Sequence, residues 1–472
     1  MNLNQTLQEK YPHLEISVLK LSEVQKDNES KRIDSEFFKK EYFDAMETMQ
    51  LNQVEYLGDN MKFNSRYSQP KYDETSKIKV INSQYIRNEY IDYENAKSGY
   101  GKIVPKESVL INATGVGTLG RVFINILDFD FSIDSHINVI VVKNKTYLNP
   151  YFLAIFLQSY YGQIQIIRYY SGTSGQIEIY PRDFNYFKIP IFPMEFQLEI
   201  QNLVKDSHKA LEESKELYKK AEETLYLELG LDPKNPLQSL LDSKTNIPTN
   251  SLNISIRTLK ESFLKTGRLD SEYYQSKYED IEKFIKSYPN GYDSFSNIIN
   301  NKDTNFTPKN NENYSYIELA NIGNNGNISE PISDLGKNLP TRARRIVSKG
   351  DVIISSIEGS LSSCALITQE FDKHLVSTGF FVLNSKLLNG ETLLVMFKSQ
   401  IFQEYLKKFP SGTILCAINK EELSKILIPK IDSTTQEKIA KYIQESFNLR
   451  KKSKQLLDNA KNKVEEQIQG KT

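Results

Sequence analysis

A glycine-rich stretch that could bind a phosphate lies at residues 111–122, with the sequence INATGVGTLGRV. Gly115, Gly117 and Gly120 have the G-x-G-x-x-G spacing, which in dinucleotide-binding proteins lets the backbone approach a pyrophosphate at a helix N-terminus. Such a site requires a helix directly after the glycines. Residues 121–126 (RVFINI) instead alternate and are rich in β-branched side chains, which predicts another strand. We therefore expect a tight turn between two strands.

Three further patterns suggest catalysis, and each is incomplete. Residues 149–152 (NPYF) approach the N-P-P-[YF] signature of amino-methyltransferases but lack its second proline. An Asn-Pro turn before an amphipathic helix explains them better. The E-x-K tripeptides at 29–31 and 213–215 lack the flanking acid that a nuclease needs. We predict no catalytic residues in this chain.

Histidines and cysteines are too few and too scattered for a metal site. They are His13, His136, His208, His374, Cys364 and Cys416. Their spacing matches no metal-binding motif, and two cysteines cannot form a disulfide framework. We predict that the chain itself holds no metal and no cofactor.

The overall charge is balanced, with 60 Lys and Arg against 60 Asp and Glu in 472 residues. A free-standing nucleic-acid binder usually carries a basic excess, so tight solitary binding is disfavoured while local basic patches remain possible. The N-terminus has no apolar signal core, and no apolar run approaches the ~18 residues of a membrane span. We expect a cytoplasmic protein without membrane contact.

The chain repeats itself at an offset of 236 to 243 residues. The matching segments are 14–18 with 252–256, 32–38 with 268–274, 80–86 with 316–322, 103–111 with 346–354, 152–159 with 392–399, and 171–191 with 411–430. This order indicates two diverged copies of one domain. The glycine stretch falls opposite residues 358–362, where one glycine survives and Glu358 enters, so a shared phosphate site is excluded.

Each copy ends in a segment with helical periodicity. After Ile189-Pro190 and Ile428-Pro429, apolar side chains recur every three or four residues. The predicted seam residues are Ile200, Val204, Leu211, Tyr218 and Leu225 in the first copy, and Ile439, Ile443, Leu457 and Val464 in the second. Small residues coincide between the copies at Ser207 and Ser446, Ser214 and Ser453, and Ala221 and Ala460. Alternating large and small residues would let the two helices approach closely.

Charge indicates that the two helices pair with each other. Residues 195–229 hold nine acids and five Lys or Arg, net −4, and residues 434–468 hold five acids and eight Lys or Arg, net +3. Unlike charges favour mutual pairing over self-pairing. A rod of 35 residues would be about 50 Å long. The alternative is two separate amphipathic helices, each packed on its own domain.

These observations predict an α+β chain with five parts. They are a first domain at 1–194, a central spacer helix at 195–229, a connector at 230–251, a second domain at 252–433 and a distal spacer helix at 434–468. The connector carries three prolines and several turn formers.

This arrangement resembles the specificity subunit of type I restriction–modification systems. The resemblance rests on RIDSEFF at 32–38, RLDSEYY at 268–274, the SGT…IP segments, and Gln197 and Gln436 at the start of the long helices. It implies two tandem α/β target recognition domains, each of which reads one half of a bipartite site in double-stranded DNA. It also implies that the helices form an antiparallel coiled coil with a pseudo-two-fold arrangement.

The resemblance further implies a non-catalytic subunit. The helices would dock two methyltransferase subunits, and restriction subunits would complete the complex. S-adenosylmethionine, ATP and Mg would be bound by those partners. The assembled complex would be an adenine-N6 DNA methyltransferase and an ATP-dependent endonuclease.

Candidate DNA contacts are polar or basic residues in turn-rich stretches. In the first copy they are Arg66, Tyr67, Lys71, Gln84, Arg87, Arg121, Ser171, Thr173 and Arg182. In the second copy they are Asn305, Arg342, Arg344, Arg345, Ser360, Ser411, Thr413 and Lys420. Arginine suits guanine edges and phosphates, and amides suit adenine. Asp34 and Asp270 are predicted to be structural, each capping a following helix with its arginine as an anchor.

Two other functions remain open at this point. One is a self-contained restriction–methylation enzyme, which the absence of a complete methyltransferase motif disfavours. The other is a coiled-coil scaffold without DNA binding, which the large globular share of the chain disfavours.

Overall fold

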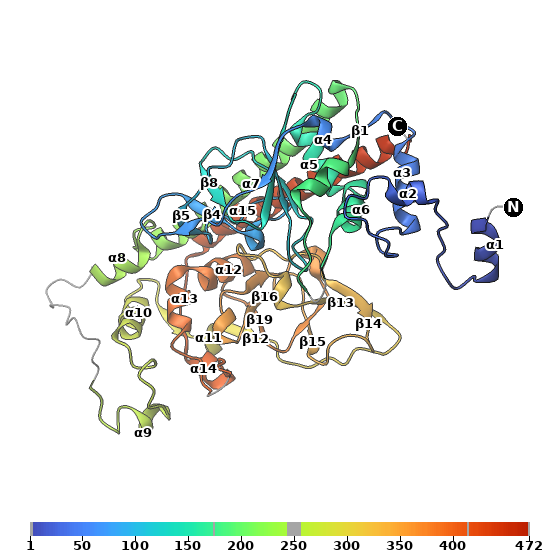
Figure 1. The fold of residues 1–472 in the computed structure, drawn as a ribbon. Helices are drawn as coiled ribbons and strands as arrows, with labels where there is room; N and C mark the ends of the chain where they lie inside the picture. The colour runs from blue at the N-terminus through green and yellow to red at the C-terminus, as the bar shows by residue number, and fades with distance from the viewer. Residues whose placement is uncertain (1–2, 173–174, 243–255, 413–414, 471–472) are drawn as a thin grey trace. The chain divides into compact units, whose positions relative to one another are not determined.

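The computed structural model shows two compact units (Figure 1). The structure describes residues 3–172, 175–242, 256–412 and 415–470. Unit 1 comprises residues 1–212 and 450–472, and unit 2 comprises residues 213–449. Each unit therefore contains one copy of the repeat together with part of both long helices. Within the described ranges, no helix is long and apolar enough to cross a membrane.

Unit 1 is built around two four-stranded sheets, ordered β2-β9-β6-β7 and β3-β5-β4-β8, and the two-stranded sheet β1-β10. The strands are β1 (Val54–Tyr56), β2 (Met61–Arg66), β3 (Lys71–Tyr72), β4 (Lys79–Ile81), β5 (Lys97–Tyr100), β6 (Val109–Asn112), β7 (Val122–Ile124), β8 (Phe131–Ile133), β9 (Ile137–Val142) and β10 (Lys188–Pro190). The helices are α1 (Leu3–Lys10), α2 (Leu21–Gln25), α3 (Lys40–Met49), α4 (Leu57–Asn60), η1 (Ser83–Tyr85), α5 (Pro150–Gln158), α6 (Tyr160–Tyr169), η2 (Pro181–Tyr186), the first part of α7 (Met194–Glu228) and the last part of α15 (Ser433–Ile468).

The central strand β6 separates two hydrophobic cores of unit 1. Val109 and Ile111 belong to the core that contains α5, whereas Leu110 points into the core that contains Phe131 of the other sheet. Successive strand side chains face opposite sides of a sheet, so an uninterrupted apolar strand fits only where both faces are covered.

Unit 2 repeats this plan with sheets β12-β19-β16-β17, β14-β13-β18-β15 and β11-β20. Its strands are β11 (Tyr292–Ser294), β12 (Ile299–Asn301), β13 (Asn313–Ile317), β14 (Ile332–Leu335), β15 (Ala343–Ile346), β16 (Val352–Ser355), β17 (Cys364–Leu366), β18 (Leu375–Ser377), β19 (Phe380–Ser385) and β20 (Leu427–Pro429). Its helices are the rest of α7, α8 (Pro236–Asp242), α9 (Phe263–Thr266), α10 (Ser276–Lys286), α11 (Phe295–Ile298), η3 (Leu319–Asn321), η4 (Glu358–Ser360), η5 (Gln369–Phe371), α12 (Gly390–Lys398), α13 (Gln400–Leu406), α14 (Lys420–Lys425) and the first part of α15 (Ser433–Ile468). A parallel strand pair occurs in both units, β4 with β8 and β13 with β18.

Two interpretations of apparent motifs are confirmed. The glycine stretch connects the antiparallel strands β6 and β7, and Gly115, Gly117 and Gly120 have φ of 91°, 79° and 83°. Asn149 caps α5 by accepting a hydrogen bond from the Tyr151 amide at 2.9 Å, with Pro150 in the first turn. The first stretch is therefore a turn, and the second is a helix start.

The long helices α7 and α15 run antiparallel within each unit. In unit 1, the Ser207 hydroxyl lies 2.9 Å from that of Ser453, and Lys463 pairs with Glu199 at 2.8 Å. In unit 2, the corresponding contacts are Ser214 with Ser446 at 3.0 Å and Thr435 with Glu228 at 2.7 Å. All nine predicted seam residues are buried. The two units thus contain the same helix contact with the roles of the helices exchanged.

The repeated arginine–aspartate pair anchors the start of each copy. Arg32 binds both carboxylate oxygens of Asp34 at 2.7 and 2.8 Å and donates to the carbonyl oxygens of Arg168 and Tyr170. Asp34 accepts a hydrogen bond from the Phe37 amide. The predicted capped helix is wrong in one respect, because the residues that follow form turns and α3 begins only at Lys40.

Arg268 and Asp270 form the same arrangement in unit 2, where Arg268 donates to the carbonyl oxygens of Phe409 and Pro410. There, too, turns follow the motif, and α10 begins only at Ser276. Each arginine therefore ties the start of its copy to a segment about 140 residues further along the chain.

The part of the connector that the structure describes is not a free tether. Leu231 and Leu240 are buried in the main core of unit 2, which also contains Leu229. The Gly230 backbone has φ of 76°, which ends α7 in a left-handed turn.

Candidate nucleic-acid interface

Three of the predicted contact residues in unit 1 lie together beside the glycine turn. Arg87 donates through Nη1 to the carbonyl oxygens of Gln84 and Ile86. Arg121 donates to the same Ile86 oxygen at 3.3 Å and to the Gly117 oxygen at 2.7 Å. The Gln84 side chain is exposed at the start of this cluster. Main-chain carbonyls therefore fix both guanidinium groups at the surface.

Neither Arg87 nor Arg121 forms an ion pair among the residues that the structure describes. Burial lowers the pKa of the Arg121 guanidinium, and the positive charge of Arg87 lowers it further. The charge of Glu89 partly offsets that of Arg121. Two fixed cations without a direct ion pair and with N–H groups to spare still suit an anionic ligand such as a phosphate.

The SGT loop of unit 1 lies against the same turn. The Gly115 amide donates to the Ile177 carbonyl at 3.0 Å, and Ser171 exchanges two main-chain hydrogen bonds with Glu178 at 2.8 Å. Arg182 is exposed, with its guanidinium 5.4 Å from the centre of the Tyr180 ring. Thr173 lies outside the described residues.

The three candidates in residues 64–72 differ in their exposure to solvent. Arg66 pairs with Glu178 and donates to the Ile179 carbonyl, so internal contacts already occupy its guanidinium. Tyr67 is buried beneath Lys102, whose ammonium lies 4.8 Å from its ring centre. Lys71 is exposed on the edge strand β3. Of these three side chains, only Lys71 is presented to solvent.

The arginines of the TRARR segment in unit 2 separate into different environments. Arg342 has 61% of its side chain exposed and lies 3.8 Å from a Glu318 oxygen. Arg344 donates to the Thr341 carbonyl at 2.6 Å. Arg345 turns inward to the Phe380 carbonyl, and burial lowers its pKa. The three side chains therefore do not form one exposed cluster, because strand alternation and a bulge at Ala343 direct them apart. Their contact with DNA stays a prediction.

The remaining candidates of unit 2 lie outside its strands, and Lys420 is the first residue of α14. Ser360 bonds the Ser355 hydroxyl at 2.8 Å, so its hydroxyl is engaged within the turn. Ser411 and Asn305 are exposed, and Thr413 lies outside the described residues. Lys420 forms an ion pair with Asp303, an acid that sequence reasoning missed because it lies 117 residues away.

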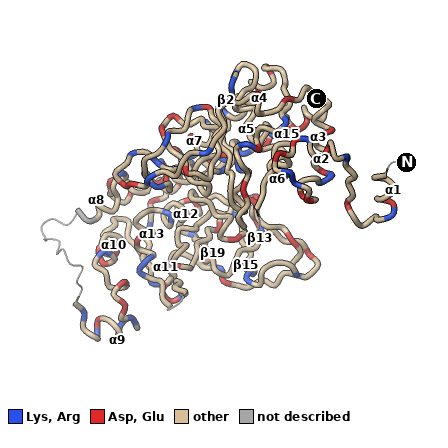
Figure 2. The backbone as a smooth tube through the Cα atoms, in the orientation of Figure 1, with Lys and Arg blue, Asp and Glu red and all other residues tan. Residues whose placement is uncertain are grey.

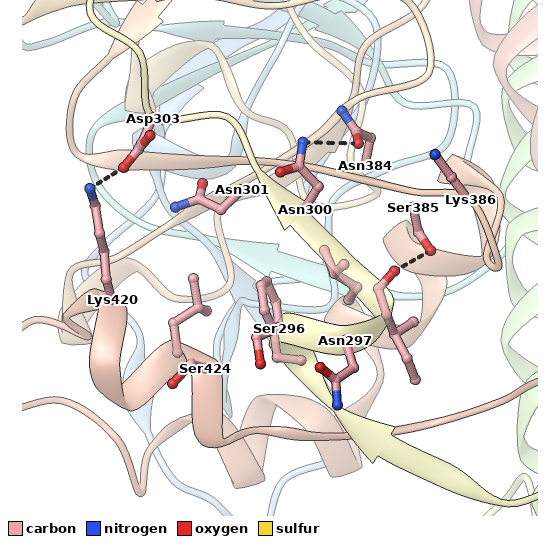
Figure 3. Close-up of a pocket in the computed structure, with 14 residues that line it drawn as sticks. Ser296, Asn297, Asn300, Asn301, Asp303, Asn384, Ser385, Lys386, Lys420 and Ser424 are labelled. Carbon is pink, nitrogen blue, oxygen red and sulfur yellow. Dashed lines mark hydrogen bonds and ion pairs between the residues drawn. The ribbon is translucent and has the colours of Figure 1, made fainter.

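Both residues of this ion pair line a groove in unit 2 (Figure 3). The groove has a volume of about 540 Å³ and lies between β12, α11 and α14. Its polar lining includes Asn297, Asn300, Asn301, Asn384 and Lys386. Lys386 has no ion pair among the described residues. Amides and a lysine can hydrogen-bond a polar ligand, but this lining lacks a nucleophile with an adjacent base.

Charged side chains of both signs are interspersed along the chain (Figure 2). The cluster formed by Arg87 and Arg121 is therefore a local feature of a chain with no net charge. Within the residues that the structure describes, no group of three or more His, Cys, Asp or Glu could hold a metal ion.

Comparison with known proteins identifies a family for the first copy. Residues 44–223 match the model of the type I restriction modification DNA specificity domain. The chain is 30% identical over 159 residues to the type I restriction enzyme HindI specificity subunit of Haemophilus influenzae (strain ATCC 51907 / DSM 11121 / KW20 / Rd). That match covers 33% of this chain and 33% of the relative, so it spans about a third of the relative's length.

Two solved structures that align with most of this chain do so with low TM-scores. The type I restriction–modification S subunit from M. genitalium aligns with a TM-score of 0.40 and 14% identity, covering 88% of this chain and 94% of that chain. The HsdS subunit from Thermoanaerobacter tengcongensis aligns with a TM-score of 0.27 and 14% identity, covering 89% and 97%. Residues 44–223 thus match the model of the family that the doubled order of segments resembles.

Proposed function

We propose that this chain is the DNA sequence-recognition subunit of a type I restriction–modification complex. Each unit reads one half of a bipartite target in double-stranded DNA, and the paired helices set the spacing between the two units. The observation that carries this proposal is the cluster of Arg87 and Arg121 beside the glycine turn, within the segment that matches the specificity domain. Phosphate contacts by such cations position a protein on DNA, while neighbouring side chains read the bases.

The chain is non-catalytic in this proposal. Two methyltransferase subunits dock on the helices, because α7 and α15 make the same contact once in each unit and so offer two similar sites. S-adenosylmethionine, ATP and Mg belong to the methyltransferase and restriction subunits. Those subunits carry out adenine-N6 methylation and ATP-dependent cleavage.

Mapping of methylated adenines in the genome tests the proposal. Deletion of the gene should remove methylation at one bipartite motif, and re-expression should restore it. Replacement of residues 1–190 with the first copy of another family member should change one half of the motif only. Unchanged methylation in the deletion strain would contradict the proposal. Methylation of DNA by the purified chain alone would favour the self-contained enzyme instead.

A further inference from the structure

The glycine turn of unit 1 has a structural counterpart in unit 2. Four main-chain hydrogen bonds recur at matched positions, with distances of 2.8 to 3.0 Å. In unit 1 the amides of Asn112, Ala113, Gly115 and Ile179 donate to the carbonyl oxygens of Arg121, His136, Ile177 and Ala113, respectively. In unit 2 the amides of Ser355, Ser356, Glu358 and Ile418 donate to those of Ser363, Gly379, Cys416 and Ser356. The residues at the two tips therefore occupy equivalent places, Val116 in unit 1 and Gly359 in unit 2.

The two tips present different chemistry. Val116 is 67% exposed between two glycines with positive φ. Unit 2 has no side chain at that position and instead has the exposed Glu358 one residue earlier. A β-branched residue is a poor turn former, and Val116 packs against no core of its unit. Nothing in the fold of unit 1 requires a valine at this place.

The turn that carries Val116 is held rigidly. The Thr118 hydroxyl donates to the Thr114 carbonyl at 2.9 Å, and the Thr114 hydroxyl lies 2.9 Å from Nδ1 of His136. Arg121 donates to the Gly117 carbonyl, directly after Val116. A rigid turn loses little conformational entropy on binding. Even a small apolar contact made by Val116 therefore contributes to the binding free energy.

We propose that Val116 contacts the 5-methyl group of a thymine in the half-site read by unit 1. The proposal rests on the proposed function and assigns one base contact to it. Arg87 and Arg121 hold a phosphate beside this base, which brings the tip to the groove. The thymine methyl is the apolar group that base pairs present in the major groove. Side chains that wedge between base pairs are mostly longer, such as Phe, Leu or Met, so contact with a methyl group fits valine better than insertion.

Removal of the thymine methyl tests this contact directly. The complex, assembled with its methyltransferase, is titrated with target duplexes in which each thymine of the first half-site is replaced in turn by deoxyuridine. One position should weaken binding about fourfold, the value of one buried methyl group. At that position Val116→Ala should bind the thymine and deoxyuridine duplexes equally. Thymines of the second half-site, which face the turn with Gly359, serve as the matched control and should show no dependence on Val116.

Several outcomes would overturn the inference. They are a first half-site without a thymine, a deoxyuridine effect of the same size in Val116→Ala, or no effect at any position. In each of these cases sequence-specific binding by the complex is intact, so the proposed function stands while this contact fails. Loss of specific binding in the wild-type complex would instead contradict the proposed function itself.

Discussion

Arg342, Arg344 and Arg345 share the strand segment around β15 but differ in what they can do. Arg342 is exposed beside Glu318, whereas Arg345 is half-buried and donates to a main-chain carbonyl. Replacement of Arg345 with an acid would place a carboxylate against the Phe380 carbonyl oxygen, which disfavours the folded state. Only Arg342 can therefore test whether this surface binds DNA without a change in folding.

For Arg342→Glu we expect weaker DNA binding by the assembled complex at all sequences. The slope of log affinity against log salt should become shallower by about one, as for the loss of one phosphate contact. Binding titrations between 50 and 200 mM salt, roughly, measure it. Lys349→Glu, another exposed cation of unit 2, is the control. An unchanged slope would show that Arg342 is an ordinary surface residue.

The Arg32–Asp34 pair makes a prediction about acid stability. The Arg32 hydrogen bonds hold the pKa of the Asp34 carboxyl below its usual value of 3.8. A lowered folded-state pKa adds stability above the unfolded-state pKa, and that stability is lost as pH falls through the folded-state pKa. The free energy of unfolding should therefore decrease as pH falls from about 5 toward 3, and less steeply in Asp34→Asn. Denaturant titrations over this range measure the difference.

The equivalent pair in unit 2 provides a matched comparison, because Arg268 lowers the pKa of Asp270 in the same way. Asp270→Asn should reduce the pH dependence with the same sign, and the double variant should reduce it further. An identical pH dependence in all four proteins would show that the two pairs contribute no stability.

At the scale of elements, the sequence predicted the two long helices and their seam more accurately than it predicted the order of the strands. The helices expected at 195–229 and 434–468 are observed at Met194–Glu228 and Ser433–Ile468. The agreement is close because the apolar period of a long helix is a local signal in the sequence. The sheet order β2-β9-β6-β7 joins strands that are far apart in sequence, and no local pattern encodes those pairings.

The register of the helices predicts one complementary pair of side chains. Ser214 faces Ser446 in unit 2, and the same antiparallel register places Ala221 opposite Ile439 in one core. Ala221→Ile should overpack the seam and lower the free energy of unfolding by about 1–3 kcal/mol. Ile439→Ala should leave a cavity and cost about 2–5 kcal/mol.

The double variant should lose less than the sum of the two, because the added volume fills the cavity. Urea unfolding followed by circular dichroism measures all four proteins. Glu216→Leu, on the exposed side of α7, is the control and should have little effect. Additive losses in the double variant would show that Ala221 and Ile439 do not face each other.

At the scale of the whole chain, both long helices pass from one unit to the other. Unit 1 ends within α7 at Glu212 and resumes within α15 at Arg450. The doubled order of segments predicted two copies of one domain. That each unit includes part of both long helices depends on packing, which a single sequence does not show. The candidate DNA contacts show the same limit, since Arg121 meets Arg87 at the Ile86 carbonyl, 35 residues earlier in the chain.

Lengthening both helices at these crossings should alter the spacing of the target. Seven residues inserted after Glu212 and seven after Leu449 add about 10 Å of helix and preserve the seam. The gap between the half-sites should grow by about three base pairs, at about 3.4 Å each, while both half-sites stay the same. Methylation mapping measures the gap.

Insertion into α7 alone is the control, because it breaks the register and should abolish methylation. Insertion after Leu229 is a poorer test, since Leu229 and Leu231 belong to the core of unit 2. An unchanged gap in the doubly lengthened variant would show that the helices do not set the spacing.

The division of α15 between the units has a consequence for how the protein is made. Leu457, Ala460, Val464 and Ile468 are buried in the main core of unit 1, and the Asn52 side chain donates to the Ile468 carbonyl. These residues are translated after all of unit 2, roughly 12–50 s later at elongation rates of about 5–20 residues per second. During that interval unit 1 has an exposed apolar seam on its own part of α7. A ribosome that stalls within the second copy therefore releases a chain whose first copy is unfinished, marked for proteolysis by that uncovered surface.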